Sequence, residues 1–232
     1  MSDAMVQLDA VSHRYEGRHG RVDALADVRL AFGAGELALI NGPSGSGKST
    51  LLLAVGGMRR PTDGAVRLAG QDLYAMNAAE RARFRASHIG FVFQTLNLIP
   101  YLSAMQNVLL AAPPAAQKQH ATRERARQLL VDLGLADRLD HKPGQLSQGE
   151  RQRAAIARAM LNGPRVILAD EPSGNLDPDN AHAAFAALRA FADAGGTVLV
   201  ATHSTLHDDV ADRVVTLRGG VVADPAAAPA HA

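Results

Sequence analysis

The sequence predicts an α/β fold built on a mainly parallel sheet, with an antiparallel β region at its start. Short apolar strands alternate with helix-forming segments along most of the chain, which is the pattern of a parallel sheet covered on both faces. A glycine-rich turn joins one such strand to the next helix. The chain has 232 residues, 47% of them hydrophobic, so we expect a globular unit with a sizeable core.

The N-terminal part is expected to form an antiparallel hairpin. Residues 6–8 and 28–32 have the composition of short strands, and a polar loop at 16–20 lies between them. The antiparallel region of the fold therefore begins the chain.

The first strand–loop–helix unit follows. Residues 36–40 form a compact apolar strand, and the proline-free apolar stretch 49–58 after the glycine-rich turn predicts a buried helix. Further strands are expected at 64–68 and 89–93, joined by an arginine-rich helical stretch at 78–86.

Residues 95–161 are expected to form a helical insert. A helix that starts near Ser103 is broken by Pro113 and Pro114, a second runs over 121–133, and a third over 149–161. The insert lies between two strands of the predicted sheet.

The rest of the chain returns to strand and helix alternation. We expect one domain over residues 1–222, followed by a proline- and alanine-rich tail at 223–232 that is disordered. The elements predicted here are strands at 165–170, 197–202, 214–217 and 221–222, and helices at 180–194 and 206–211.

Composition excludes several functional classes. Basic residues number 24 and acidic residues 23, so the formal charge is +1, and the chain lacks the overall excess of positive charge that is typical of nucleic-acid-binding proteins. The absence of cysteine excludes disulfides, thiolate metal sites and cysteine nucleophiles, and fits a reducing cytoplasm. No apolar run reaches the roughly 20 residues of a membrane-spanning helix. Residues 1–9 lack the pattern of a secretory signal.

A nucleotide loop is predicted between the strand at 36–40 and the helix at 49–58. In such a loop backbone N–H groups wrap the phosphates, Lys48 reaches the outer ones and the Ser49 hydroxyl binds Mg²⁺. The pattern arises by chance in only about one chain in a hundred of this length. The residues concerned are Gly42, Pro43, Ser44, Gly45, Ser46, Gly47, Lys48, Ser49 and Thr50.

Two carboxylates stand at the end of the strand at 165–170: Asp170 is its last residue, and Glu171 begins the turn that follows. Asp170 is placed to join the magnesium shell, and Glu171 can orient or deprotonate water. The alternative interpretation is a plain acidic turn before Pro172. Pairing with the glycine-rich loop favours the catalytic interpretation.

Seven motifs in a fixed order resemble the ATP-binding cassette (ABC) ATPases, over roughly residues 6–222. Together they imply the P-loop fold of that family, with its antiparallel β region and helical insert. The motifs are Tyr15, residues 42–50, Gln94, residues 146–150, residues 167–171, residues 175–177 and His203.

The resemblance implies roles for individual residues. Tyr15 would stack on adenine, and Gln94 would reach Mg²⁺ and the attacking water. Glu171 would be the general base, and His203 would contact the γ-phosphate. Lys48 would neutralise phosphate charge.

The resemblance also implies that ATP lies between two subunits arranged head to tail. Ser147 and Glu150 form a capping box at a helix start, and that N-terminus can bind an anion. Ser147, Gln148, Gly149 and Asp177 would thus complete the ATP site. Gln148 stands where the family usually has glycine, and Glu150 where glutamine is common.

The function implied is ATP hydrolysis that drives a separate membrane permease from the cytoplasmic face of the cell membrane. The subunit would pair with a copy of itself or a second ATPase, without nucleic acid. Residues 81–108 and 169–177 resemble the branch that serves lipoprotein release and macrolide export. A cell-division ATPase and an amino-acid importer ATPase remain alternatives. The spacing of Lys48 and Ser147 leaves no room for the coiled coil of repair ATPases, and translation ATPases carry two cassettes.

Overall fold

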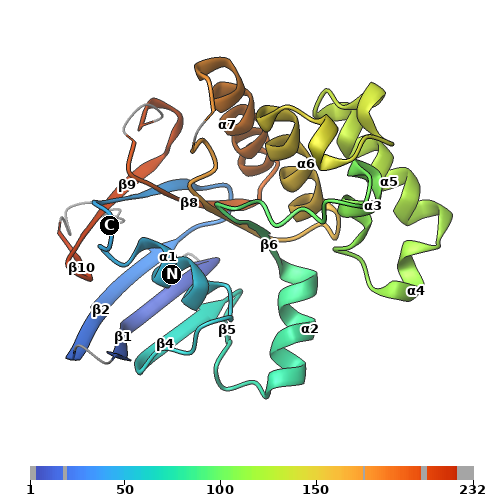
Figure 1. The fold of residues 1–232 in the computed structure, drawn as a ribbon. Coiled ribbons are helices and arrows are strands. Elements are labelled where there is room, and N and C mark those ends of the chain that lie inside the picture. Colours follow the sequence, from blue (N-terminus) through green and yellow to red (C-terminus); the bar gives the residue numbers. More distant parts are fainter. Residues whose placement is uncertain (1–3, 18–19, 175, 205–207, 224–232) are drawn as a thin grey trace.

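Six strands form a central, mainly parallel sheet in the order β10-β9-β3-β8-β7-β6 (Figure 1). The structure is a computed structural model that describes residues 4–17, 20–174, 176–204 and 208–223. All neighbouring pairs are parallel except β10 with β9, so the predicted sheet is confirmed. The strands are β3 (Leu37–Asn41), β6 (Ile89–Val92), β7 (Val166–Asp170), β8 (Thr197–Thr202), β9 (Arg213–Arg218) and β10 (Val221–Val222).

The central sheet is buried on both faces because its apolar residues alternate between two cores. Leu37 and Leu39 of β3 join one core with α6 and α7, whereas Ala38 and Ile40 join the opposite core with α1 and the N-terminal sheet. Helix α6 spans Gln148–Met160, α7 spans Pro178–Asp193 and α1 spans Lys48–Val55. Successive side chains of β3 point to opposite faces of the sheet, and both faces are buried. The sequence of β3 is therefore a continuous apolar run.

The N-terminal sheet is antiparallel and has the order β2-β1-β4-β5. Its strands are β1 (Val6–Gly17), β2 (Gly20–Phe32), β4 (Asp63–Leu68) and β5 (Gln71–Asp72). The predicted hairpin is confirmed, but β1 and β2 are much longer than expected. Register shifts interrupt their pairing at three points, and Ala10 and Asp27 have left-handed φ angles of 53° and 47°. Such bulges break the alternation by which a strand is recognised in sequence.

A helical lobe projects from the central sheet on the side of β6 (Figure 1). It has its own apolar core, which includes Val108 of α3, Leu130 of α5 and Ala157 of α6. Pro114 is the first residue of a short helix. Proline is tolerated at this position because the backbone N–H that it lacks would have no partner in the first turn of a helix. The elements are α3 (Ala104–Leu109), α4 (Pro114–Gln117), α5 (His120–Asp132) and the 3₁₀ turns Ala136–Arg138 and Pro143–Gln145.

The remaining elements agree with the predicted order. Helix α2 (Ala78–His88) begins at a capping box of Asn77 and Glu80 and leads into β6. A 3₁₀ turn, Asp208–Val210, occupies the end of the helix predicted at 206–211. Residues 206–207, most of the predicted tail and Asn175 of the motif at 175–177 lie outside the described residues. Within the described ranges, no helix is long and apolar enough to cross a membrane.

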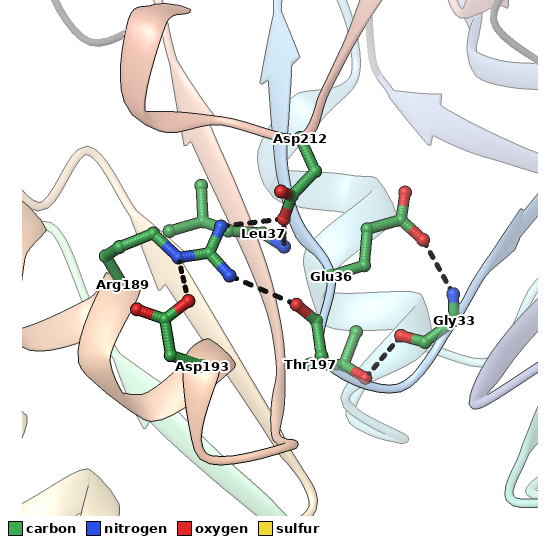
Figure 2. A network of polar contacts seen from close by, with 8 residues as sticks. Gly33, Glu36, Leu37, Arg189, Asp193, Thr197 and Asp212 are labelled. Carbon is green, nitrogen blue, oxygen red and sulfur yellow. Dashed lines mark hydrogen bonds and ion pairs between the residues drawn. The ribbon is translucent and has the colours of Figure 1, made fainter.

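A polar network ties α7 to the beginnings of the central strands (Figure 2). Arg189 donates to Asp193 over 2.9 Å, to Asp212 over 2.7 Å and to the Gly35 carbonyl over 3.1 Å. Asp212 also accepts a 2.7 Å hydrogen bond from the Leu37 amide. Burial by itself raises the pKa of Asp212, but the hydrogen bonds from Arg189 and Leu37 outweigh it and lower that pKa.

The network should contribute pH-dependent stability. We expect Arg189→Met to lower the free energy of unfolding by about 1–2 kcal/mol at pH 7, since the Asp212 pair is partly exposed. Because the folded pKa of Asp212 is depressed, its contribution is present above the unfolded value of about 3.9 and is lost as pH falls through the folded pKa. Urea unfolding at pH 7 and pH 3 checks this: the difference between variant and wild type should shrink at the lower pH. An equal difference at both pH values would contradict it.

Candidate functional site

The glycine-rich loop between β3 and α1 forms one wall of a cleft of about 710 Å³. Gly47 has a φ of 105°, and a Cβ at this position would collide with the Ala24 carbonyl. Only glycine therefore allows the loop to turn directly into α1, whose first N–H groups have no partner inside the helix. These N–H groups and the positive end of the helix dipole make an anion site. All predicted loop residues from Pro43 to Thr50 line the cleft; Gly42 lies just before it.

Lys48 lies across the loop. Its ammonium group donates to the carbonyls of Gly42 over 2.8 Å and of Pro43 over 3.2 Å, and the residue is only 8% exposed. The lysine charge is thus concentrated where the loop would hold phosphate.

Candidate oxygen ligands for a cation lie at the start of α1 and at the end of β7. The Ser49 hydroxyl donates to an Asp170 carboxylate oxygen over 3.1 Å, and Gln94 lines the same cleft. Burial raises the pKa of Asp170, and the hydrogen bond from Ser49 opposes that rise. A hydroxyl, a carboxylate and an amide oxygen fit Mg²⁺, which uses few protein ligands and takes the rest from phosphate and water.

Glu171 and His203 form a pair at the mouth of the cleft. Glu171 Oε1 lies 2.9 Å from His203 Nδ1, and the side chains are 11% and 70% exposed. Glu171 has a left-handed φ of 48°, and its backbone N–H donates a hydrogen bond to the Ala201 carbonyl on β8, which helps to hold that conformation. Such strain at a carboxylate that faces a cleft is typical of functional positions.

Tyr15 of β1 also lines the cleft. Its hydroxyl lies 3.3 Å from the Thr50 hydroxyl, and the Arg59 guanidinium carbon lies 5.4 Å from its ring centroid. Val22 pairs directly with Tyr15 across β1 and β2 and also lines the cleft. A ring beside an apolar residue in the cleft can receive a flat apolar base.

The predicted signature residues lie at the N-terminus of α6. Ser147 caps α6 because its hydroxyl accepts from the Glu150 amide, and the Glu150 carboxylate accepts from the Ser147 amide, so the predicted capping box is confirmed. Gly149 is required because a Cβ there would collide with Asn180 of α7. Asp177 caps α7 by accepting from the Asn180 amide over 2.9 Å.

The signature residues are separate from the cleft of the same chain. Among the described residues that line the cleft, none is Ser147, Gln148, Gly149 or Asp177. Gln148 instead lies near Gly174, with its amide nitrogen 3.4 Å from that carbonyl. The structure therefore brings together the loop, Tyr15, Gln94, Glu171 and His203, with Asp170 joined through Ser49. It leaves the capped start of α6 apart.

Comparison with known proteins identifies the family. The family model described as ABC transporter matches residues 25–174, well over half of the chain. The chain belongs to the ABC transporter family. This ABC ATPase is similar to the lipoprotein-releasing system ATP-binding protein LolD of Maricaulis maris, with 44% identity over 95% of this chain and 96% of that protein.

A second relative is longer. The macrolide export ATP-binding/permease protein MacB of Chromobacterium violaceum is 43% identical over 100% of this chain, which spans only 36% of that MacB's length. A solved dimeric ATP-binding cassette in a post-hydrolysis state with ADP and Pi superposes with a TM-score of 0.85. It is 36% identical over 95% of this chain and 97% of that one. These matches confirm the predicted family, that of the ABC ATPases, and its fold.

The sequence of this ABC ATPase did not predict all of the residues that line the cleft. Val22 and Ala24 belong to the part of β2 that was not expected to be a strand. A hollow of about 550 Å³ adjoins the cleft, sharing Gln94, Glu171 and His203 and adding Leu176 and Pro178. Only the register of Tyr15 with Val22 could have indicated the first two, and the bulges hide that register.

Proposed function

We propose that this ABC ATPase is the nucleotide-binding subunit of a membrane transporter of the lipoprotein-release or macrolide-export type. The observation that carries the proposal is the meeting, in one cleft, of the Lys48 loop, the Ser49–Asp170 pair and the Glu171–His203 pair. This combination provides charge neutralisation, cation ligands and a base for phosphoryl transfer to water.

The chain's own residues divide the work of hydrolysis. Lys48 and the loop N–H groups neutralise the phosphates, and Tyr15 stacks on the base. Ser49, Gln94 and Asp170 would hold Mg²⁺, which would supply charge stabilisation to the transferred phosphoryl group. Glu171 takes a proton from the attacking water, and its pairing with His203 at 2.9 Å fixes the direction of its carboxylate.

Two copies of the chain are proposed to complete the site. The N-terminus of α6 has an anion-binding geometry but lies apart from its own cleft, so Ser147 and Gly149 can meet only the nucleotide of a partner. Gln148 and Asp177 flank that contact. Two ATP molecules would then lie between subunits arranged head to tail. The dimeric solved relative supports this proposal.

The helical lobe is proposed to receive a cytoplasmic helix from the permease. Tyr101, on the segment after Gln94, is 72% exposed, and Leu110 at the end of α3 is 45% exposed. Exposed aromatic residues of this kind are common at protein interfaces. We therefore propose that the subunit is a peripheral protein on the cytoplasmic face of the cell membrane, without a nucleic-acid partner.

The permease dock can be tested with Tyr101→Asp. We expect affinity purification from membranes in gentle detergent to recover far less integral membrane protein, because the charge disrupts an apolar contact. Basal ATP hydrolysis should stay within about twofold of wild type, a change of only ~0.4 kcal/mol in the barrier. Val221→Asp, on the far edge strand β10, is the matched control.

Charge reversal on α2 provides a second probe. Arg81 and Arg85 donate to the carbonyls of Met76 and Gly57, so only the exposed Arg83 can be reversed without breaking fold contacts. Arg83→Glu should weaken recovery of the permease. If ribosomes or DNA are recovered in place of an integral membrane protein, the transporter proposal is wrong.

A further inference from the structure

The turn that follows Gln94 has a strained backbone. Leu96 and Asn97 have consecutive left-handed φ angles of 58° and 49°, a conformation that is unfavourable for a bulky residue such as leucine. Local bonds from the Leu96 amide to the Phe93 carbonyl and from the Asn97 amide to the Thr95 carbonyl close the turn. Strain of this kind persists only where the surrounding structure holds it.

An arginine from another element holds this turn. Arg158, in the last turn of α6, donates to the Asn97 carbonyl over 2.7 Å and also to the Leu96 carbonyl. It is half-buried, and among the described residues no carboxylate forms an ion pair with it. Its hydrogen bonds to the two carbonyls therefore replace the bonds to water that burial removes. Because the guanidinium group is planar and donates to both carbonyls, it fixes the orientation of the turn.

The same helix carries the proposed signature contact at its other end. Helix α6 begins at the Ser147 cap, and Arg158 lies in its final turn. The segment beyond the turn is also attached to the helical lobe, because the buried Asn107 of α3 bonds to the backbone of Ile99, Leu102 and Ser103. The chain after Gln94 is thus fixed to the lobe on both sides of Leu98.

We propose that Arg158 is a positioning residue that sets the place of Gln94 in the nucleotide cleft. It ties the turn after Gln94 to the last turn of α6 and so fixes the backbone from which the Gln94 side chain projects. The inference rests on the proposed contact of Gln94 with Mg²⁺.

The test compares the Mg²⁺ concentration that gives half-maximal ATP hydrolysis in four single variants and one double variant of the full chain. Arg158→Met removes both bonds, and Arg158→Lys keeps the charge but lacks the planar guanidinium group. Gln94→Ala removes the group that is positioned. Arg125→Met is the matched control, because Arg125 also donates to two carbonyls, those of Met160 and Leu161, away from the Gln94 turn.

We expect Arg158→Met to raise the Mg²⁺ midpoint about tenfold, as Gln94→Ala does, with Arg158→Lys in between. The double variant that combines Arg158→Met with Gln94→Ala should have the same Mg²⁺ midpoint as Gln94→Ala alone, because Arg158 acts through Gln94. Amide hydrogen exchange over residues 95–98 should become faster in Arg158→Met. Arg125→Met, with a comparable loss of thermal stability, should leave the midpoint and that exchange unchanged.

The outcomes separate the two proposals. If Gln94→Ala shifts the midpoint and Arg158→Met does not, the positioning role is wrong while the proposed function stands. If neither variant shifts it, the contact of Gln94 with Mg²⁺ is wrong and the positioning role fails with it. A shift in Arg125→Met equal to that in Arg158→Met would reduce the effect to general loss of stability and overturn the inference.

Discussion

Replacing Glu171 with glutamine is expected to lower the ATP turnover rate by about 10²-fold or more, because the proton acceptor is lost. ATP binding should remain, since Lys48, Ser49 and Asp170 are unchanged and glutamine has nearly the shape of glutamate. The carboxamide oxygen can still accept from His203, so the pair need not separate. Turnover under saturating ATP and equilibrium binding of a labelled ATP analogue measure the two effects separately.

A matched carboxylate provides the control for this variant. Asp209 lines the adjoining hollow but not the nucleotide cleft, so Asp209→Asn should keep turnover close to that of wild type. Turnover of Glu171→Gln within about threefold of wild type would remove Glu171 from the role of general base, because a missing base costs far more.

Ser147→Arg is expected to abolish hydrolysis while leaving ATP binding to the single chain intact. The substitution places a bulky cation at the start of α6, apart from the chain's own cleft but in the proposed path of the partner's nucleotide. It also removes an N-cap worth about 0.5–2 kcal/mol. Ser147→Ala, which loses the cap without adding bulk, controls for that loss of stability.

Mixing two inactive variants tests whether the site is shared. Lys48→Ala should fail at ATP binding, because the outer phosphates lose their cation. In a mixed dimer of Ser147→Arg with Lys48→Ala, one site has both Lys48 and Ser147 and should hydrolyse ATP. An active pure Ser147→Arg protein would mean that Ser147 serves only as a helix cap.

The sequence predicts the nucleotide cleft well because its residues follow continuous apolar strands. Asp170 and Glu171 come at the end of β7, and the loop comes at the end of β3. These two strands are parallel and only β8 lies between them, so their carboxyl ends bring both to one edge of the sheet. The order of elements and the mainly parallel sheet follow from the same signals. Bulges in β1 hid the length of the N-terminal hairpin and with it the pairing of Tyr15 with Val22.

Tertiary contacts between distant elements could not be predicted from sequence. The residues around Arg158 in the sequence do not indicate its bonds to residues 96 and 97, and the strained φ angles there have no glycine to signal them. Likewise, Gly149 is required by Asn180, a residue on a different helix. Such requirements depend on how α6 packs, which local patterns do not specify.

The central claim is that ATP joins two copies of this chain head to tail. The most direct test is the molar mass of Glu171→Gln by light scattering, with and without Mg²⁺ and ATP, because this variant binds ATP without turning it over. We predict a monomer without nucleotide and a dimer with it, and a monomer in both conditions for Glu171→Gln combined with Ser147→Arg. A Glu171→Gln protein that binds ATP at saturation and stays monomeric, or a dimer that survives the Ser147→Arg change, would contradict the claim.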